Sequence, residues 1–436
     1  MIDKCIDRKS ARNLTLHNQY INDLFSEISN CSPDIIGMTL FSRELKEIAA
    51  LCRLIKQEFK SAYIVLGGPH PTAMPEETLE QIPDCDFVVR GEGETILHNL
   101  VLSLSDNKPL YDVKGISFRT DNNTRIHSCD DAQPISDLDL LPFPDRQGLI
   151  HNYRNGNYSS FVYGCPSDIL MTSRGCPYQC HFCFKVCVKY RSRSPENVLK
   201  EIDWVVKNIS PQYIQIMDDS FTIQRERTTK ILDTLIERKY PIKFKVRSRV
   251  NAVDEALLIK MKQAGVSTIV YGFESGSQQM LDAFNKKTSV EQNITACRLT
   301  RKAGLICLGD MILFYPGENK QTLKETEKFI RKAKPTAVKF YVLTPLPKTR
   351  IYEDAKKAGR LVGDWNIDSE TPWVKLDEFS SPEQMRKIAK KMFIKTLLNP
   401  FRIFWLLKSY GKIFLSKPSL TFRMMTYNLC KKKESY

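Results

Sequence analysis

The sequence lacks the features that mark several specialised classes of protein. No uncharged apolar run reaches the roughly 18 residues of a membrane-spanning helix, and the nearest candidate, residues 392–407, is broken by two charged residues and a proline. The polar first ten residues predict no secretory signal and a cytoplasmic location. The 19 glycines and 22 prolines exclude collagen-like and low-complexity chains. A chain of 436 residues, 42% of them hydrophobic, can instead bury a substantial core in two or three domains.

The net charge is distributed unevenly, because acidic residues are scarce near the end of the chain. The net charge is +15, and residues 381–436, with 13 basic and two acidic residues, account for +11 of it. The basic charge therefore belongs to a tail, and the nearly neutral remainder does not indicate a nucleic-acid partner. Phe and Trp interleave with the basic residues of the tail. This pattern fits a peripheral membrane-surface contact, a lid over a hydrophobic substrate, or a helical appendage packed on the protein.

Apolar segments typical of strands alternate with helical patterns in two parts of the chain. In the first part we expect strands at 33–41, 61–69 and 85–94. The second part is longer, and its expected strands are 169–176, 213–221, 242–250, 267–275, 306–315 and 337–345. Helical patterns separate these strands at 195–209, 224–239, 254–264, 289–303 and 319–333. Six strand–helix units predict a partial parallel (β/α)6 barrel with its chemistry at the carboxyl ends of the strands.

Three cysteines form the sharpest motif of the sequence. Cys176, Cys180 and Cys183 follow the first expected barrel strand in RGCPYQCHFCF, with C-x3-C-x2-C spacing. Thiolates are ligands for iron–sulfur clusters and for zinc, and three ligands for four irons leave one iron open to a substrate or cofactor. The alternatives are a zinc site with His181 as its fourth ligand, or simple buried cysteines.

In this context the motif resembles that of the radical S-adenosylmethionine (SAM) superfamily, in which an aromatic residue, here Phe182, precedes the third cysteine. The resemblance implies that Cys176, Cys180 and Cys183 hold a 4Fe–4S cluster whose open iron chelates SAM. The reduced cluster then splits SAM to methionine and a 5′-deoxyadenosyl radical, which abstracts hydrogen from the substrate. An external electron donor of the flavodoxin or ferredoxin type is also implied.

Other strand ends resemble SAM-contacting motifs of the same superfamily. MDDSFT suggests Asp218 and Asp219 for the SAM amino group or a bound water, and VRSRVNA suggests Arg247 and Arg249 for its carboxylate. YGFESGSQ suggests Glu274 as a further SAM contact. The alternative for each residue is an ion pair at the rim of the barrel.

Two positions depart from the family pattern. Phe314 in DMILFYPGE and Lys348 in TPLPKTRIY stand where a glycine is common.

The N-terminal part resembles the cobalamin-binding domain that precedes many radical SAM barrels. The resemblance rests on LGGPHPTAMPEE and DFVVRGEGE, and it suggests Gly67 and Gly68 for close backbone approach to the cofactor. His70 is either a ligand or a structural turn residue. The extra strand and helix that normally open this domain are expected to be missing, with residues 1–7 as a remnant strand. Cobalamin binding by a shortened domain therefore stays open at this point.

Together these observations predict an α/β protein with a partial parallel (β/α)6 barrel after a truncated Rossmann-like cobalamin-binding-type domain, followed by a helical basic C-terminal tail. The expected domains are 1–105, a hairpin and linker over 106–165, the barrel over 166–350, and the extension over 351–436.

The resemblance implies radical SAM chemistry, with cobalamin-dependent methyl transfer or rearrangement of a lipid, tetrapyrrole or natural-product substrate as one form of it. The alternatives are a cobalamin-independent enzyme that modifies tRNA or a peptide, and a non-catalytic iron–sulfur regulator.

Overall fold

The computed structural model describes residues 14–120, 125–150, 166–187 and 189–398. The chain divides into two compact units. The first unit comprises residues 1–135 together with the later segment 364–371. The second unit comprises residues 136–363 and 372–436.

The first unit is built on one mixed sheet with the strand order β1-β2-β3-β4-β5. Strands β1 (Ile35–Thr39), β2 (Tyr63–Gly67) and β3 (Phe87–Val89) are parallel, as the alternating pattern predicts. The expected hairpin is also present, as β4 (Ile116–Thr120) and β5 (Arg125–Ser128), and it extends the sheet in antiparallel fashion. The turn of this hairpin lies outside the described residues.

Helices complete the first unit. Helix α2 (Leu45–Glu58) buries Leu45, Ile48, Cys52 and Ile55, which recur at helical spacing. The other helices of this unit are α1 (Leu14–Cys31), α3 (Pro69–Ala73), α4 (Pro75–Gln81) and α5 (Gly93–Ser105). The expectation that no additional helix precedes β1 is wrong, because α1 occupies that place. The suggested remnant strand at residues 1–7 lies outside the described residues.

The second unit contains the predicted six-stranded parallel sheet, in the order β13-β12-β11-β10-β9-β6. In the part of the chain that is described, its end strands do not pair with each other, so the barrel is partial, as expected. The strands are β6 (Ser167–Leu170), β9 (Tyr213–Ile216), β10 (Lys243–Ser248), β11 (Val266–Glu274), β12 (Ile306–Leu313) and β13 (Ala337–Val342).

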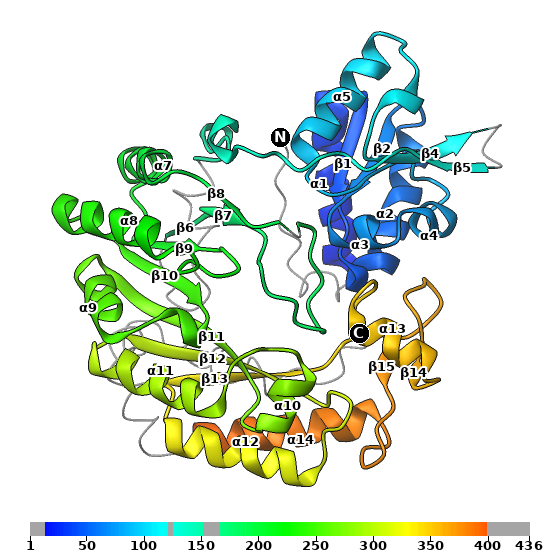
Figure 1. Cartoon of the computed structure of the whole chain (residues 1–436). Helices are drawn as coiled ribbons and strands as arrows, with labels where there is room; N and C mark the ends of the chain where they lie inside the picture. Colours follow the sequence, from blue (N-terminus) through cyan, green and yellow to red (C-terminus); the bar gives the residue numbers. More distant parts are fainter. Residues whose placement is uncertain (1–13, 121–124, 151–165, 188, 399–436) are drawn as a thin grey trace. The chain divides into compact units, whose positions relative to one another are not determined.

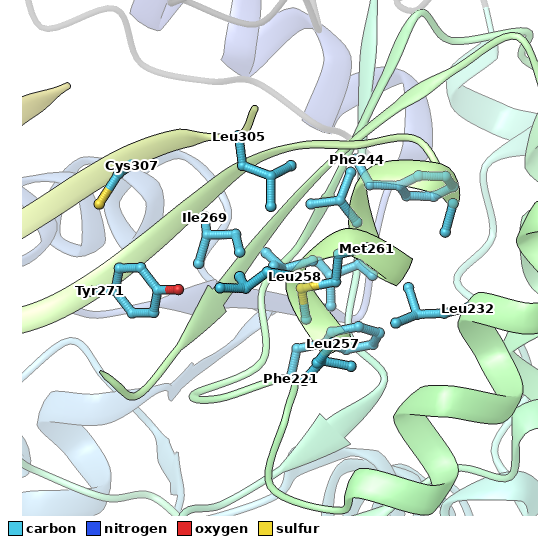
Figure 2. Close-up of a cluster of buried hydrophobic side chains, with 14 of the residues drawn as sticks. Phe221, Leu232, Phe244, Leu257, Leu258, Met261, Ile269, Tyr271, Leu305 and Cys307 are labelled. Carbon is cyan, nitrogen blue, oxygen red and sulfur yellow. The ribbon is translucent and has the colours of Figure 1, made fainter. Parts of the chain in front are cut away.

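Amphipathic helices cover the outer face of this sheet (Figure 1). They are α7 (Pro195–Asn208), α8 (Arg225–Arg238), α9 (Glu255–Gln263), α11 (Val290–Lys302) and α12 (Lys320–Ala333). The core lies between helices and sheet, where Leu258 and Met261 of α9 lie near Ile269 and Tyr271 of β11 (Figure 2). Because strand residues alternate between faces, each second strand residue points away from this core.

Shorter elements complete the second unit. Helices α10 (Gln278–Ala283) and α13 (Arg350–Lys357) follow β11 and β13, and strands β14 (Leu361–Val362) and β15 (Trp373–Val374) pair antiparallel. Helix α14 (Pro382–Leu397) packs Met385, Ala389 and Met392 into a core cluster that also contains Leu313 and Leu343. The rest of the basic tail, residues 399–436, lies outside the described residues. Among those that are described, no helix is long and apolar enough to cross a membrane.

Candidate cofactor site at the carboxyl ends of the barrel strands

The three cysteines lie on a loop that leaves the first barrel strand and is closed by a short ladder. Strand β7 (Ser173–Arg174) pairs antiparallel with β8 (Arg191–Ser192), so residues 175–190 form a loop that starts and ends at the same place. The ladder therefore fixes both ends of the cysteine segment at the carboxyl edge of the sheet.

Asp218, just beyond β9, anchors the start of this loop. Its Oδ1 accepts from the backbone N–H groups of Thr172 (2.6 Å) and Ser173 (3.1 Å). Its Oδ2 accepts from the hydroxyl groups of the same residues, at 2.5 and 2.7 Å. Four donors use the acceptor capacity of both carboxylate oxygens. We infer that Asp218 positions the loop, which leaves Asp219 as the acid of this pair that can face a ligand.

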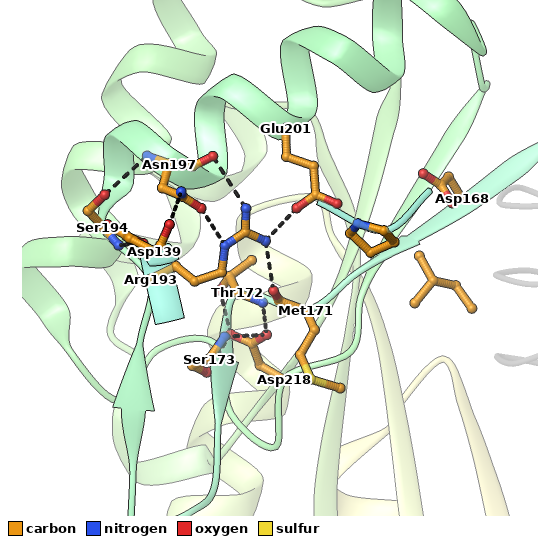
Figure 3. Close-up of polar contacts among 12 residues, drawn as sticks. Asp139, Asp168, Met171, Thr172, Ser173, Arg193, Ser194, Asn197, Glu201 and Asp218 are labelled. Atoms are coloured by element: carbon orange, nitrogen blue, oxygen red, sulfur yellow. Dashed lines mark hydrogen bonds and ion pairs between the residues drawn. The ribbon is translucent and has the colours of Figure 1, made fainter. Parts of the chain in front are cut away.

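Polar contacts also connect this loop region to α7 (Figure 3). Arg193 donates to Asn197 Oδ1 at 2.7 Å and to the carbonyl oxygen of Met171 at 3.1 Å, and it pairs with Glu201. Glu201 is 1% exposed and forms a second ion pair, at 2.8 Å, with Arg146 of the expected linker. Buried charges of opposite sign thus neutralise each other beneath the first barrel strand.

The loop docks onto the end of α10 through backbone and side-chain hydrogen bonds. The His181 amide donates to the carbonyl oxygen of Phe284 at 3.0 Å, and His181 Nδ1 lies 3.0 Å from the carbonyl oxygen of Ala283. Asn285 Nδ2 donates to the carbonyl oxygen of Gln179 at 2.7 Å. His181 thus holds the loop in place.

All three cysteines have free thiols, and Cys183 reaches solvent. Desolvation by the surrounding protein, with added repulsion from Cys180, Asp219 and Cys176, raises the pKa of Cys183 to about 11. The three sulfur groups and Asp219 therefore lie within electrostatic range of one another. A metal that binds thiolate has to displace this proton, so metal binding here is coupled to proton release.

The arrangement of the cysteines fits an iron–sulfur cluster better than zinc. Among the described residues, no three His, Cys, Asp or Glu side chains are arranged to hold a single ion. The zinc alternative with His181 is therefore not supported. A 4Fe–4S cluster binds each thiolate through a different iron, and its ligands stand further apart than those of one ion. Three free thiols on one closed loop can supply one thiolate to each of three irons.

Arg249, which follows β10, lies beside the cysteine loop. Its guanidinium stands 3.6 Å above the centre of the Tyr178 ring, and its Nη1 lies 3.9 Å from Cys180 Sγ. It also donates to the carbonyl oxygen of Lys286, and its side chain is buried. A fixed positive charge is thereby placed next to the thiols, where it favours anionic ligands.

Glu274 ends β11 in the left-handed conformation, with φ 59°, after a register irregularity in its pairing with β12. It forms a buried 2.7 Å ion pair with Lys286, a residue that the sequence motifs do not indicate. Gly272 makes room for the pair, since a Cβ there would lie 2.3 Å from Glu274 Oε1 and 2.9 Å from Lys286 Nζ. Phe182 lies nearby, with its ring 5.9 Å from Lys286 Nζ and 5.6 Å from the Phe284 ring.

The two arginines suggested for the SAM carboxylate lie in different places. Arg249 is buried beside Cys180, whereas Arg247 is exposed, on the face of β10 that points away from the helices. Desolvation and the neighbouring Asp218 raise the pKa of Asp219, while Lys185 and Arg247 lower it.

The first unit presents its own carboxyl edge, at the ends of β1, β2 and β3. Gly67 ends β2, and Gly68 has φ 100°, where an added Cβ would meet Thr39 Cγ2 at 2.8 Å. Thr72 bridges two strand ends, because its hydroxyl donates to the carbonyl oxygen of Gly68 (2.7 Å) and accepts from the Gly91 amide (2.9 Å). Thr72 therefore connects the end of β2 to the segment after β3, and Gly68 lets Thr39 and Leu40 pack closely against it.

His70 occupies a structural position in this unit. Its side chain is fully buried, and its Nδ1 lies 2.9 Å from Ser42 Oγ. Burial lowers the pKa of the His70 imidazole to about 4, so the ring is neutral at physiological pH. Of the two roles open to this residue, the geometry favours the structural one.

Fold and site together define a partial parallel (β/α)6 barrel with a three-cysteine loop at the carboxyl ends of its strands, in one chain with a second α/β unit. Comparisons with known families agree. The model of the radical SAM superfamily matches residues 170–330, and that of the B12-binding domain matches residues 11–101. The family match to the B12-binding domain spans α1 and thus agrees with the corrected start of this domain.

Relatives share both parts. An uncharacterized methyltransferase of Pyrococcus horikoshii is 31% identical over 386 residues, which are 87% of this chain and 82% of the relative. An anaerobic magnesium-protoporphyrin IX monomethyl ester cyclase of Rubrivivax gelatinosus is 28% identical over 83% of this chain and 65% of its own length. The solved structure of OxsB, a cobalamin-dependent SAM radical enzyme with aqua-cobalamin and SAM bound, superposes with a TM-score of 0.73 at 22% identity, covering 95% of this chain and 67% of that one.

The chain belongs to the radical SAM superfamily, in the group whose barrel is preceded by a B12-binding domain. Its radical SAM domain implies a 4Fe–4S cluster and SAM as cofactors, and its B12-binding domain supports cobalamin as a third. Enzymes of this superfamily act on small-molecule substrates and need an electron donor.

Proposed function

We propose that this chain is a cobalamin-dependent radical SAM methyltransferase acting on a tetrapyrrole, lipid or natural-product substrate. One observation carries the proposal: three free thiols share a closed loop at the edge of the barrel that also presents Arg249 and Glu274. The B12-binding domain in the same chain and the methyltransferase relative support methyl transfer over other radical reactions.

In this proposal Cys176, Cys180 and Cys183 hold the cluster. When bound, the cluster supplies the electron that cleaves SAM reductively, and cobalamin supplies a methyl carrier. The protein binds and orients SAM: Arg249 offers a guanidinium to its carboxylate, and Asp219 offers a carboxylate to its ammonium group.

Glu274 and Phe182 complete this part of the proposal. Glu274 is held by Lys286 at the end of β11, which fixes its orientation toward the edge that binds SAM. Phe182 shields the cysteine loop from water on the side of Phe284. In the first unit, Gly67 and Gly68 lie at the carboxyl end of β2, where the lack of a side chain is proposed to let cobalamin approach the backbone.

The test is anaerobic reconstitution of the full chain with iron, sulfide and hydroxocobalamin. After desalting, bound iron and cobalamin are quantified, and 5′-deoxyadenosine is assayed with SAM and a reductant. We expect iron, cobalamin and 5′-deoxyadenosine together. Iron and 5′-deoxyadenosine without cobalamin would overturn the cobalamin-dependent part, and iron without SAM cleavage would point to a non-catalytic regulator.

Single variants test the ligands. Cys176→Ala, Cys180→Ala and Cys183→Ala should each lose most of the iron and at least a hundredfold of the SAM cleavage, because one missing thiolate destabilises the cluster. Cys187→Ala is the matched control, since it removes another thiol from the same loop. A protein that keeps its iron after any of the first three changes would contradict the assignment.

A further inference from the structure

A set of charged side chains lies on the inner face of the barrel sheet, the face opposite the covering helices. On β10, Phe244 and Val246 belong to the core between sheet and helices, so the alternating residues Lys245 and Arg247 point to the inner face. The fractional exposure along the strand alternates in the same way.

Two further charges join this face from β12 and β13. Met311 and Val338 belong to the core, which places their neighbours Asp310 and Lys339 on the inner face. Asp310 and Lys339 are partners in the β12–β13 register, and the partner of Asp310 on β11 is Gly272. We call Lys245, Arg247, Lys339 and Asp310 the inner-face cluster.

The electrostatics show that these four groups act on one another. Burial raises the pKa of Asp310, while Arg247, Lys339 and Lys245 oppose that rise. Burial lowers the pKa of Lys245 to about 8, with further repulsion from Lys339 and Arg247. Three cations thus share this face of the sheet with one carboxylate, and of these four groups Lys245 and Asp310 are partly buried.

Positive charge is in excess on this surface. Over the described residues, no ion pair joins Lys245, Arg247 or Lys339 to any carboxylate. Two further acids act on members of the cluster: Glu274 acts on Asp310 but is already paired with Lys286, and Asp219 acts on Arg247. Lys245 is the partly buried cation of the three, since Arg247 and Lys339 are exposed, and an anionic ligand that contacts Lys245 offsets the cost of its desolvation.

The same face carries large apolar side chains. Leu170 of β6 is part of the core, and its neighbour Ile169, on the inner face, is 58% exposed. Tyr341, two residues after Lys339 on β13, is 48% exposed. These apolar side chains lie on the two edge strands of the face that carries the cationic cluster, an arrangement that matches a ligand with an apolar body and an anionic group.

We propose that the inner-face cluster binds a carboxylate or phosphate group of an otherwise apolar substrate, with Lys245, Arg247 and Lys339 as its donors. The inference rests on the proposed function, because the substrate has to lie in the barrel that generates the radical. It assigns Arg247 to the substrate and leaves Arg249 to SAM. The anionic group then fixes the substrate at a point remote from its reacting carbon, which orients the reaction.

Binding of three probes to the reconstituted full chain tests the proposal. 2-Naphthoate and 2-naphthyl phosphate carry the two candidate anions, and 2-naphthol is the uncharged match; equilibrium dialysis gives each Kd at pH 7. We expect one or both anions to bind about tenfold or more tightly than 2-naphthol, since hydrogen bonds to charged groups are strong. The probe that binds more tightly indicates whether the substrate carries a carboxylate or a phosphate group. Equal affinity for all three probes would overturn the proposal.

Variants sharpen the test. The double variant Lys245→Met/Lys339→Met should lose the anion preference, while Lys262→Met, on the exposed side of α9, should keep it. Asp310→Asn removes the one carboxylate of the cluster and should tighten anion binding severalfold, a gain that misfolding cannot produce. Anion binding that is unchanged in both inner-face variants would also overturn the proposal. Failure of the proposed function can be distinguished from failure of this inference, because the parent protein would then not cleave SAM.

Discussion

The two residues that stand where the family pattern has glycine both adopt the left-handed backbone conformation that glycine favours. Phe314, after β12, has φ 68°, and Lys348, after β13, has φ 56°. Phe314 is buried against Phe379, with ring centroids 5.0 Å apart, so its packing offsets the strain. Phe314 thus keeps the backbone conformation that a glycine would adopt at this position, and its side chain is buried in the core.

Lys348 has no such compensation, because its side chain is exposed. We predict that Lys348→Gly raises the free energy of unfolding by about 1 kcal/mol, since a left-handed conformation costs a side-chain-bearing residue about that much. Urea denaturation measures the change. Lys324→Gly, at an exposed position within α12, is the control and should lower stability by about 1 kcal/mol. A loss of stability in Lys348→Gly would contradict the prediction.

At the scale of elements, Glu318 closes the connection between β12 and α12. It is 4% exposed, accepts from the Phe314 amide, and lies 3.5 Å from Thr322 Oγ1. Burial raises the pKa of Glu318 to about 7, and these two hydrogen bonds oppose the rise. The folded protein therefore holds this proton more tightly than the unfolded chain does, across the range between the ordinary pKa of 4.5 and about 7.

This proton makes stability depend on pH. Because the pKa of Glu318 is higher in the folded protein than in the unfolded chain, protonated Glu318 contributes its full stabilisation below pH 4.5. This contribution to the free energy of unfolding, on the order of 3 kcal/mol, is lost as pH rises through about 7. Glu318→Gln keeps an acceptor for the Phe314 amide without the charge. We predict that denaturant unfolding between pH 5 and pH 8 shows a smaller loss for Glu318→Gln than for the parent. Glu237→Gln, exposed on α8, should behave like the parent; the prediction fails if Glu318→Gln does so too.

The elements that sequence reasoning predicted well are those with a repeated local signal. Each barrel strand combines apolar alternation with a polar terminus, and the expected helix at 289–303 is observed as α11 (Val290–Lys302). Helices α3 and α4 have no clear signal in the sequence, because PHPTAMPEE contains three prolines, which are equally typical of loops. In the structure, Pro69 and Pro75 stand at the first positions of the two helices.

The candidate site shows the same limit. The cysteines and Glu274 were visible as motifs, whereas Lys286 was not, because a single lysine after a helix has no local signature. Only the fold brings it within 2.7 Å of Glu274. The inner-face cluster likewise depends on the register of three strands, which no motif encodes.

At the scale of the whole molecule, the chain order and the structural units differ. Residues 364–371 follow the barrel strands but belong to the first unit. Ile367 packs against the core cluster that contains Leu40 and Leu79, and its amide donates to Gln81 Oε1 at 2.9 Å. Gln81 Nε2 in turn donates to the carbonyl oxygen of Trp365 at 3.3 Å. A late segment thus completes the core of the cobalamin-type unit.

The stability of the first unit should therefore depend on a residue that lies more than 200 positions after its sheet. Ile367→Ala removes half-buried methyl groups from that core, and we predict a loss of about 1–3 kcal/mol, confined to the first unit. Hydrogen exchange followed by mass spectrometry should show faster exchange in β1–β3, by roughly tenfold or more, with barrel peptides unchanged. Ile259→Ala, 43% exposed on α9, is the matched control and should leave β1–β3 unaffected. Equal exchange in parent and Ile367→Ala would mean that residues 1–135 form their core without the late segment, and the first unit would then be continuous in sequence.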